Sequence, residues 1–250
     1  MPLFKSPLVS KTQYKTAALI LAAGNSTRMG GDISKQFMKI DGVPVLALTL
    51  IAYQKTPRIS EIIVASRMED FDEIAKIREQ YGISKLRQVV AGGKDRQESA
   101  ERAFSKISDD IRYVAIADGA RCLITPQEIT DVCLTAYRHR AASAAQRVVG
   151  TVKRTTPRGA VLETVDRRNL WEAQTPQVFH VALYTAALKK LKASGYSAVT
   201  DDNEIVERMG CKVQLVECSK QNMKITTPED IAIATAILKM RKQCEEETTS

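Results

Sequence analysis

Short apolar runs alternate with longer amphipathic segments through the first 140 residues of the chain. In most of the short runs apolar and β-branched residues follow one another directly, which is typical of strands buried on both faces of a sheet. In most of the longer segments apolar residues recur every three or four positions, as on one face of a helix. This alternation predicts an α/β fold with a Rossmann-like, doubly wound, mostly parallel sheet. The predicted strands are 17–21, 61–65, 86–90 and 113–117, and the helices that follow them are 44–54, 69–81, 96–107 and 126–140.

Two Thr-Pro pairs mark helix starts. Thr125 precedes Pro126, and Thr227 precedes Pro228. A threonine hydroxyl can accept a hydrogen bond from the first turn, and proline is favoured at the first helical position, where no N–H is needed. The second pair therefore predicts a C-terminal helix.

The alternation changes between residues 144 and 165. Two extended segments, 144–152 and 160–165, flank the tetrad Thr-Pro-Arg-Gly at 156–159, which is typical of a turn and predicts a β-hairpin. Because a two-stranded hairpin is marginal in water, its alternating valines need a partner surface. We therefore expect 144–168 to be an arm that projects from the sheet and pairs with a second copy in a homodimer. The valines are Val148, Val152, Val161 and Val165, and the charged residues are Arg147, Lys153, Arg154, Arg158, Arg167 and Arg168 against Glu163 and Asp166.

The 250 residues fit one domain with an excursion. We place a single domain at 16–243, with loose termini at 1–15 and 244–250. The longest unbroken apolar run, 17–23, is far shorter than the roughly 20 residues that span a bilayer, so neither a membrane segment nor a membrane partner is expected. It leads into a polar loop without a clear cleavage site, which favours a buried strand over a signal peptide.

The net charge of +8 is dispersed along the chain, and only 5% of the residues are aromatic. No basic run or stacking platform indicates a nucleic-acid partner, whereas small phosphorylated ligands suit a few well-placed cations. The cysteines are odd in number and have no CxxC spacing, which argues against a disulfide framework and a zinc site and favours a reducing cytoplasm. They are Cys122, Cys133, Cys211, Cys218 and Cys244.

The loop after the first predicted strand is the strongest candidate for chemistry. Ligands of doubly wound sheets bind at the carboxyl ends of the strands. Here small residues let backbone N–H groups approach an anion, and Arg28 and Lys35 add full charges. Five residues separate Gly24 from Gly30, which excludes a Walker A loop, and Ser26 occupies the second glycine position of a GxGxxG motif.

Eight ordered motifs over about 16–240 together resemble the 2-C-methyl-D-erythritol 4-phosphate cytidylyltransferase family of the non-mevalonate isoprenoid route. The first is also similar to the nucleotide-binding signature of the wider group of transferases that activate sugar and sugar-alcohol phosphates. The motifs are LAAGNSTRMG with KQF (21–30 and 35–37), GGKDRQES (92–99), DGAR (118–121), TVKR (151–154), ETVDR (163–167), WEAQTPQ (171–177), TDD (200–202) and NMKIT (222–226).

The resemblance implies transfer of CMP from CTP to 2-C-methyl-D-erythritol 4-phosphate with release of pyrophosphate, assisted by Mg²⁺. The substrate phosphate attacks the α-phosphorus of CTP in line. A phosphate monoester is largely dianionic at pH 7, so cations matter more than a general base. The two histidines, His139 and His180, are accordingly expected to be surface or packing residues.

The resemblance also assigns roles to residues. Arg28 and Lys35 would stabilise the transition state, and Arg167 and Lys224 would complete the catalytic set. The nucleotide would contact Ala22, Ala23, Gly24, Gly93, Lys94, Ser99 and Asp118. The polyol phosphate would contact Asp118, Arg121, Thr175, Thr200 and Lys224 of one chain with Thr151, Lys153 and Arg167 of the other. Mg²⁺ would be held mainly by the CTP phosphates, with Asp118 as a possible ligand.

Two positions depart from the family pattern, which usually has glycine at Ser26 and proline at Cys122; neither change removes a charge. The nearest alternative is a ribitol-5-phosphate cytidylyltransferase, with the same fold and chemistry on another polyol. A dinucleotide-dependent dehydrogenase would need a cleaner GxGxxG and a proton-relay residue. A non-catalytic nucleic-acid binder is disfavoured by the dispersed charge.

Overall fold

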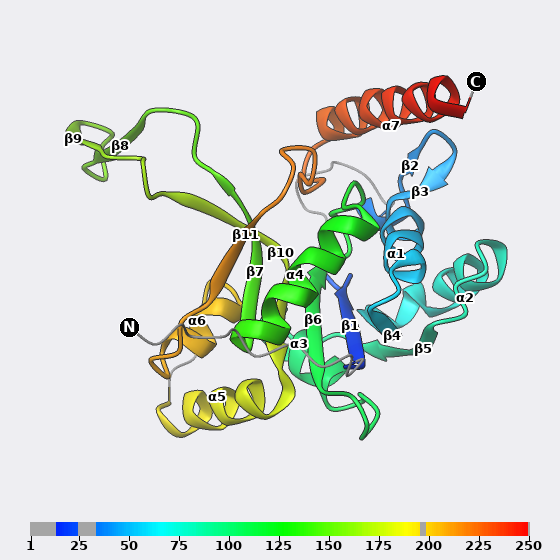
Figure 1. Ribbon diagram of the computed structural model, residues 1–250, viewed down its shortest axis with the longest axis horizontal. Coiled ribbons are helices and arrows are strands. Elements are labelled where there is room, and N and C mark those ends of the chain that lie inside the picture. The colour runs from blue at the N-terminus through cyan, green and yellow to red at the C-terminus, as the bar shows by residue number, and fades with distance from the viewer. Residues whose placement is uncertain (1–13, 25–33, 196–198, 250) are drawn as a thin grey trace, which may run out of the picture.

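A computed structural model describes residues 14–24, 34–195 and 199–249 of the protein. Its centre is a seven-stranded sheet of order β11-β7-β10-β6-β1-β4-β5 (Figure 1). The pairs β1–β4, β1–β6, β4–β5 and β7–β11 are parallel, and β10 is antiparallel to both its neighbours. The predicted α/β fold with a mostly parallel sheet is therefore confirmed. The strands are β1 (Thr16–Leu21), β4 (Ile59–Ser66), β5 (Leu86–Ala91), β6 (Tyr113–Asp118), β7 (Ala141–Arg147), β10 (Trp171–His180) and β11 (Gln214–Glu217).

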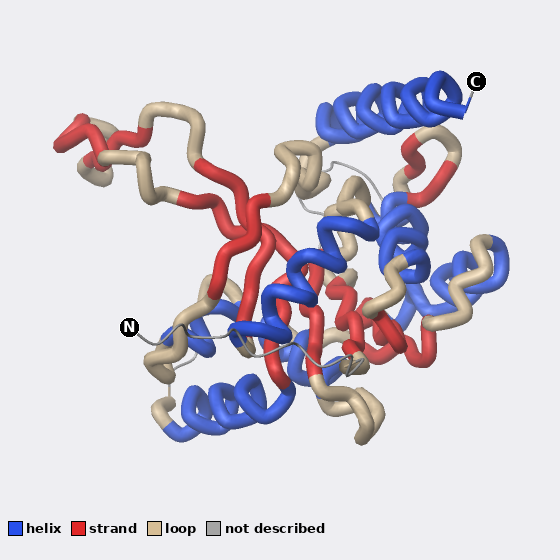
Figure 2. The backbone as a smooth tube through the Cα atoms, viewed as in Figure 1, coloured by secondary structure: helices blue, strands red, loops and turns tan. Residues whose placement is uncertain are grey.

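Helices cover both faces of the sheet (Figure 2). On β1, Ala18 and Ile20 face one apolar cluster, and Ala17 and Leu19 face the other, as the period of two in a strand requires. The first cluster includes α1 (Val45–Lys55), α2 (Phe71–Gln80) and α4 (Pro126–His139), and the second includes α3 (Arg96–Phe104), α5 (Val181–Ala193) and α6 (Asp202–Glu207).

The predicted helix starts agree with the structure. The Thr125 hydroxyl accepts from the Glu128 amide (3.2 Å), and Glu128 accepts in return from the Thr125 amide (2.9 Å), which completes a capping box at α4. The C-terminal helix α7 (Pro228–Thr249) begins at the second Thr-Pro pair. Ala234 of α7 packs with Ile225 and Ile40 in a third, smaller cluster.

Some boundaries differ from the sequence prediction. The chain inserts a short hairpin, β2 (Lys39–Ile40) with β3 (Val43–Pro44), before α1. The helix predicted over 96–107 ends at Phe104. The prediction placed the first strand of the arm at 144–152, but 144–147 belongs to β7, where Arg147 pairs with Trp171 of β10.

The hairpin itself consists of β8 (Val152–Thr155) and β9 (Val161–Val165), and it projects away from the main sheet (Figure 1). Val161 is 60% exposed and Leu162 is 62% exposed. Val149, in the segment leading to β8, is 59% exposed. The projecting segment, 148–170, thus presents apolar side chains that its own chain does not cover, and we call it the arm from here on.

No helix in the described ranges has the length and apolar content that crossing a bilayer requires. Cys122, Cys133, Cys211 and Cys218 are free thiols. Burial raises the pKa of Cys122, Cys133 and Cys218 to about 12, so these thiols stay protonated and unreactive at neutral pH.

Candidate active site

The carboxyl ends of four parallel strands meet at one edge of the sheet. Leu21 at the end of β1 pairs with Ala65 of β4 and with Asp118 of β6, and Ser66 of β4 pairs with Ala91 of β5. Backbone hydrogen bonds tie the loops that follow: the Gly119 amide donates to the Leu21 carbonyl (2.8 Å), and the Gly92 amide donates to the Ser66 carbonyl (2.7 Å). This edge therefore brings together loops from distant parts of the sequence, as expected for a doubly wound sheet.

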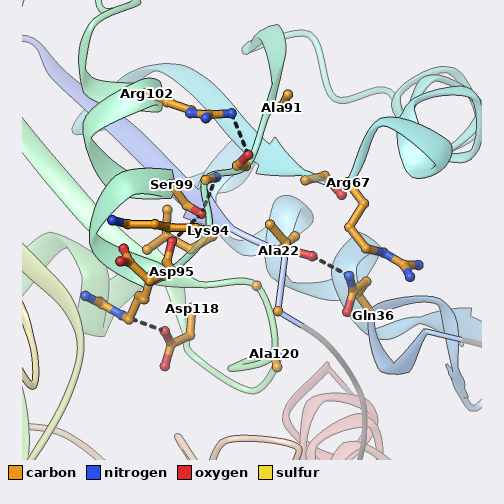
Figure 3. A pocket seen from close by; sticks show the side chains of 18 of the residues that line it. Ala22, Gln36, Arg67, Ala91, Lys94, Asp95, Ser99, Arg102, Asp118 and Ala120 are labelled. Atoms are coloured by element: carbon orange, nitrogen blue, oxygen red, sulfur yellow. Dashed lines mark hydrogen bonds and ion pairs between the residues drawn. The ribbon is translucent and has the colours of Figure 1, made fainter.

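These loops surround a cavity of about 670 Å³ (Figure 3). Among the described lining residues, six are basic (Lys35, Arg67, Lys94, Arg96, Arg102, Lys224) and two are acidic (Asp95, Asp118), so the cavity suits an anionic ligand. The structure brings together nine of the predicted site residues in its wall. They are Ala22, Ala23, Gly24, Lys35, Gly93, Lys94, Ser99, Asp118 and Lys224.

Lys35 lies in a short 3₁₀ helix, Lys35–Phe37, that follows the loop 22–34 after β1. The sequence of this loop contains the motif similar to a nucleotide-binding signature, and we call it the nucleotide loop. The next residue, Gln36, is buried, and its amide donates a hydrogen bond to the Ala22 carbonyl (Figure 3). This contact fixes the 3₁₀ helix against the end of β1 and so places Lys35 at the cavity. The sequence analysis did not assign a role to Gln36, although its position beside Lys35 was a signal for one. Arg28 lies outside the described residues.

The loop after β5 presents backbone groups at the cavity. Asp95 caps α3 by accepting from the Glu98 amide (2.8 Å). The Ser99 hydroxyl accepts from the Gly93 amide (2.9 Å) and donates to the Asp95 carbonyl (2.8 Å). The Lys94 amide donates in the same way to Glu98 Oε2 (3.0 Å). Ser99 is therefore held by the same turn whose backbone it stabilises, and the loop has a fixed conformation at the cavity.

Gly92 is required where the loops after β1 and β5 meet. A Cβ at Gly92 would lie 2.2 Å from the Cβ of Ala23, far inside normal contact. We expect Gly92→Ala to push the nucleotide loop away from the cavity, at a cost of about 1–3 kcal/mol of stability, and to lower kcat/KM for the nucleotide by about tenfold. Steady-state kinetics checks this. The double variant Gly92→Ala/Ala23→Gly removes the clash and should recover most of the loss; no recovery would show that crowding is not the cause.

Asp118 is the last residue of β6, and its carboxylate lies close to three cationic side chains. Its carboxylate lies 3.0 Å from Lys224 Nζ, 3.4 Å from Arg121 Nε and 3.6 Å from Arg96 Nε. Burial raises the pKa of Asp118, but the positive charges of Lys224, Arg96 and Arg121 outweigh burial and hold this pKa below its usual range. The carboxylate is thus ionised at neutral pH, with oxygens available to accept hydrogen bonds.

Arg96 and Asp202 form an ion pair that the sequence analysis did not assign. Arg96 Nη1 lies 2.5 Å from Asp202 Oδ2, and Asp202 Oδ1 accepts from the Tyr184 hydroxyl (2.6 Å). Burial lowers the pKa of Arg96, but Asp202 and Asp118 raise it above its usual value. Both residues lie inside motifs quoted above, so the motifs signalled their importance. The two residues are 106 positions apart in the sequence, so no local sequence pattern could predict that they are in contact.

Arg121 and Thr175 support Asp118 from below the cavity and are not among its lining residues. The Asp118 amide donates to Thr175 Oγ1 (3.0 Å), and Arg121 donates to the Asn222 carbonyl (2.8 Å). Asn222 donates in turn to the Thr175 carbonyl (3.1 Å), next to the cis peptide bond between Thr175 and Pro176. The predicted polyol contacts at Arg121 and Thr175 thus lie one layer behind Asp118 in this structure.

Four predicted residues lie elsewhere. Thr200 is exposed, and its hydroxyl donates to Glu204 at the start of α6 (2.9 Å). Thr151, Lys153 and Arg167 are exposed on the arm, which projects away from the main sheet (Figure 1). Lys153 Nζ donates to Thr164 Oγ1 (2.6 Å), and Arg167 donates to the Val149 carbonyl. None of the four lines the cavity.

The two histidines are distant from the cavity wall. His180 caps α5 by accepting from the Ala182 amide (3.2 Å) and lies against the ring of Tyr113, with 5.2 Å between ring centroids. His139 is exposed at the end of α4. Burial, followed by the charges of Arg140 and Arg112, lowers the pKa of His180. Both histidines are accordingly packing or surface residues.

The chain matches known proteins over most of its length. A family model described as 2-C-methyl-D-erythritol 4-phosphate cytidylyltransferase matches residues 16–240. A protein of that name from Caldanaerobacter subterraneus subsp. tengcongensis is 40% identical over 224 residues, which cover 89% of this chain and 98% of the relative. The corresponding protein of Alkaliphilus metalliredigens is 38% identical over 237 residues, covering 92% of this chain and 97% of the relative.

Solved structures agree with the sequence matches. The crystal structure of 4-diphosphocytidyl-2C-methyl-D-erythritol synthase from Anaerococcus prevotii superposes with a TM-score of 0.80 at 30% identity, covering 91% of this chain and 97% of that one. The 2-C-methyl-D-erythritol 4-phosphate cytidylyltransferase of Francisella tularensis gives a TM-score of 0.74 at 30% identity, covering 88% and 98%. With its basic cavity at the carboxyl edge of the sheet, this chain belongs to the 2-C-methyl-D-erythritol 4-phosphate cytidylyltransferase family.

Proposed function

We propose that this chain transfers CMP from CTP to 2-C-methyl-D-erythritol 4-phosphate, giving 4-diphosphocytidyl-2-C-methyl-D-erythritol and pyrophosphate. The observation that carries the proposal is the basic cavity between the nucleotide loop and Asp118, in a chain of this family. The cavity has cations for phosphates on the Lys35 side and an ionised carboxylate for hydroxyl groups at Asp118. Phosphate and hydroxyl groups are what a nucleoside triphosphate and a polyol phosphate present to a protein.

The cytosine is placed against the loop after β5, and the triphosphate against the loop after β1. The amides of Gly93 and Lys94 are already bonded within the loop, so the carbonyls of these two residues and the hydroxyl oxygen of Ser99 read the base edge. An unpaired buried polar group would penalise a wrong base. Lys35 and Arg28 stabilise negative charge at the α-phosphate. The acceptor phosphate, held by Lys224, attacks phosphorus and expels pyrophosphate on the opposite side. No proton has to be removed from the acceptor dianion.

Mg²⁺ fits this site as a metal held mainly by the nucleotide. No group of three His, Cys, Asp or Glu side chains in the described part of the chain is arranged to hold a metal ion. Mg²⁺ bound to nucleotides usually keeps several waters and takes only one or two carboxylates, so Asp118 is a sufficient protein ligand. When bound, the ion neutralises charge on the triphosphate oxygens. Lys35 and Lys224 then act on the charge that remains.

The arm supports a homodimer in which two chains share their sites. Val149, Val161 and Leu162 are exposed on the arm and need a covering surface. A second copy supplies it in an isologous contact, and Thr151, Lys153 and Arg167 then reach the polyol phosphate of the partner chain. The free thiols of Cys122, Cys133, Cys211 and Cys218 suit a reducing cytoplasm.

Pyrophosphate release tests the substrate assignment. With CTP, Mg²⁺ and 2-C-methyl-D-erythritol 4-phosphate, we expect turnover that disappears when the metal is chelated. ATP should support much less turnover than CTP, because adenine presents different hydrogen-bonding groups from cytosine to the polar atoms of the Gly93–Ser99 loop. Ribitol 5-phosphate tests the alternative acceptor. Equal rates with ATP, or turnover with ribitol 5-phosphate alone, would contradict the assignment.

The pH dependence should follow the substrate rather than Asp118. Because the folded-state pKa of Asp118 is lowered, this carboxylate stays ionised at neutral pH and loses its contribution only as the pH falls below the usual carboxyl range. The acceptor phosphate takes up its proton near pH ~6. We expect kcat/KM for the acceptor to fall with a slope of one proton below about pH 6. Asp118→Asn should lower kcat/KM at every pH but leave the pH at which it begins to fall unchanged. If the fall below about pH 6 is absent in this variant, the titrating group is Asp118 and not the acceptor phosphate.

A further inference from the structure

Arg96 has two carboxylate partners at very different distances. Its Nη1 lies 2.5 Å from Asp202 Oδ2, whereas its Nε lies 3.6 Å from Asp118 Oδ1, beyond hydrogen-bond length. The guanidinium is therefore bonded to Asp202 and only attracted to Asp118. The side chain of Arg96 is 31% exposed and lines the cavity.

Asp202 is held more firmly than a surface partner would be. It is 1% exposed, and its second oxygen, Oδ1, accepts from the Tyr184 hydroxyl at 2.6 Å. Tyr184 is itself fully buried and stacks on Phe179 of β10, with ring centroids 5.4 Å apart. The Asp202 amide donates to Gln177 Oε1 of β10 (3.0 Å). Three elements, α5, α6 and β10, thus fix this carboxylate in place.

The charge around Asp118 shows what the ion pair achieves. Lys224 at 3.0 Å and Arg121 at 3.4 Å are nearer to the Asp118 carboxylate than Arg96. A guanidinium released from Asp202 has its best new partner in Asp118, because a bidentate arginine–carboxylate pair is among the strongest charge-assisted contacts. Such a pair would occupy the oxygens that a substrate hydroxyl or a metal-bound water needs.

We propose that Asp202 is a positioning residue that holds Arg96 away from Asp118 and so keeps the Asp118 carboxylate open to the acceptor. The inference rests on the proposed function, since it concerns the acceptor side of the same site. Asp202 is not among the described residues that line the cavity, so it acts on the substrate only through Arg96. Loss of the Asp202 carboxylate should therefore weaken use of the acceptor but not binding of the nucleotide, which is placed at the loops after β1 and β5.

The kinetic test separates the two substrates. In Asp202→Asn we expect kcat/KM for 2-C-methyl-D-erythritol 4-phosphate to fall by about 10–100-fold, while the KM for CTP stays within about threefold of wild type. The matched control is Glu207→Gln. Glu207 is an exposed carboxylate at the end of α6, and among the described residues it makes no contact with Arg96 or Asp202. This control should leave both constants near wild type.

A double variant distinguishes positioning from a structural loss. In Asp202→Asn/Arg96→Gln no guanidinium remains to cover Asp118, so acceptor kcat/KM should recover by at least about fivefold relative to Asp202→Asn alone. A double variant as impaired as Asp202→Asn would overturn the proposal. If Asp202→Asn does not fold in thermal melts, Tyr184→Phe decides, because it removes the hydroxyl that holds Asp202 Oδ1. Acceptor kcat/KM should then fall by about fivefold or more while the KM for CTP stays within about threefold of wild type, and wild-type acceptor kinetics would overturn the proposal.

A crystal structure of Asp202→Asn gives a readout that does not depend on turnover. Arg96 should then contact Asp118 at hydrogen-bond distance, and an unmoved Arg96 would overturn the proposal. Absence of turnover in the wild-type protein would contradict the proposed function alone, because the position of Arg96 in the variant is read independently.

Discussion

Lys35→Ala is expected to lower kcat by about 10²–10³-fold, which corresponds to roughly 3–4 kcal/mol of lost transition-state stabilisation. Lys35 lines the cavity directly after the nucleotide loop, and the neighbouring contact between Gln36 and the Ala22 carbonyl holds its backbone in place. A preorganised cation is worth most where negative charge develops, so the loss should appear in kcat. Pyrophosphate release at saturating substrates measures it.

The matched control for this substitution is Lys39→Ala. Lys39 lies four positions further on, in β2, and is exposed. Lys39→Ala removes the same charge from the same region, but Lys39 does not line the cavity, so the kcat of this variant should stay near the wild-type value. Both variants should unfold at temperatures close to that of the wild type, because neither removes a core side chain. The same kcat loss is expected for Arg28→Ala. Wild-type turnover in Lys35→Ala would show that Lys35 is only a surface charge.

Mixing two inactive variants should restore activity if the arm completes the site of the partner chain. In a dimer of Lys35→Ala with Arg167→Ala, one cavity contains Lys35 from its own chain and receives Arg167 from the other. That cavity is intact, and the second cavity lacks both groups. We therefore expect about half of the wild-type activity per mixed dimer, against nearly none for either variant alone.

A second mixture controls for nonspecific recovery. Lys35→Ala with Lys224→Ala should stay inactive, because both lysines line the cavity of a single chain and no mixed dimer rebuilds one. Subunit exchange is verified with differently tagged chains. Absence of recovery with Arg167→Ala despite exchange, or a monomer at assay concentrations, would mean that each chain builds its own site.

The parallel part of the sheet could be predicted because its strands are short apolar runs set apart by polar turns. β7 and β10 could not. The sequence of β7 is Ala-Ala-Ser-Ala-Ala-Gln-Arg, and alanine favours helices. β10 carries the polar side chains of Gln174 and Gln177 in its buried part, where Gln177 bonds to Asp201 and Asp202 and Gln174 to Asn222. Tertiary partners thus determine both strands, and a single sequence does not display them.

The site could be predicted as far as its residues lie in the loops after β1, β5 and β6. Lys35, Ser99 and Asp118 each follow a recognisable strand, so their common edge follows from the fold. The layer behind them could not be placed in this way. Arg121 was assigned to the substrate, yet its side chain is only 12% exposed and donates to the Asn222 carbonyl. Which atoms of a motif face a ligand and which support it depends on packing between distant segments.

The arm begins and ends at neighbouring points of the main sheet, since Arg147 at the end of β7 pairs with Trp171 at the start of β10. In engineering terms the arm is an insertion in what would otherwise be an ordinary β-hairpin. A two-residue Asn-Gly turn has the geometry to join two such antiparallel strands directly. The chain is therefore modular: a shortened version would keep the sheet and the nucleotide cavity, and arms from related enzymes could be exchanged at this junction without redesigning either.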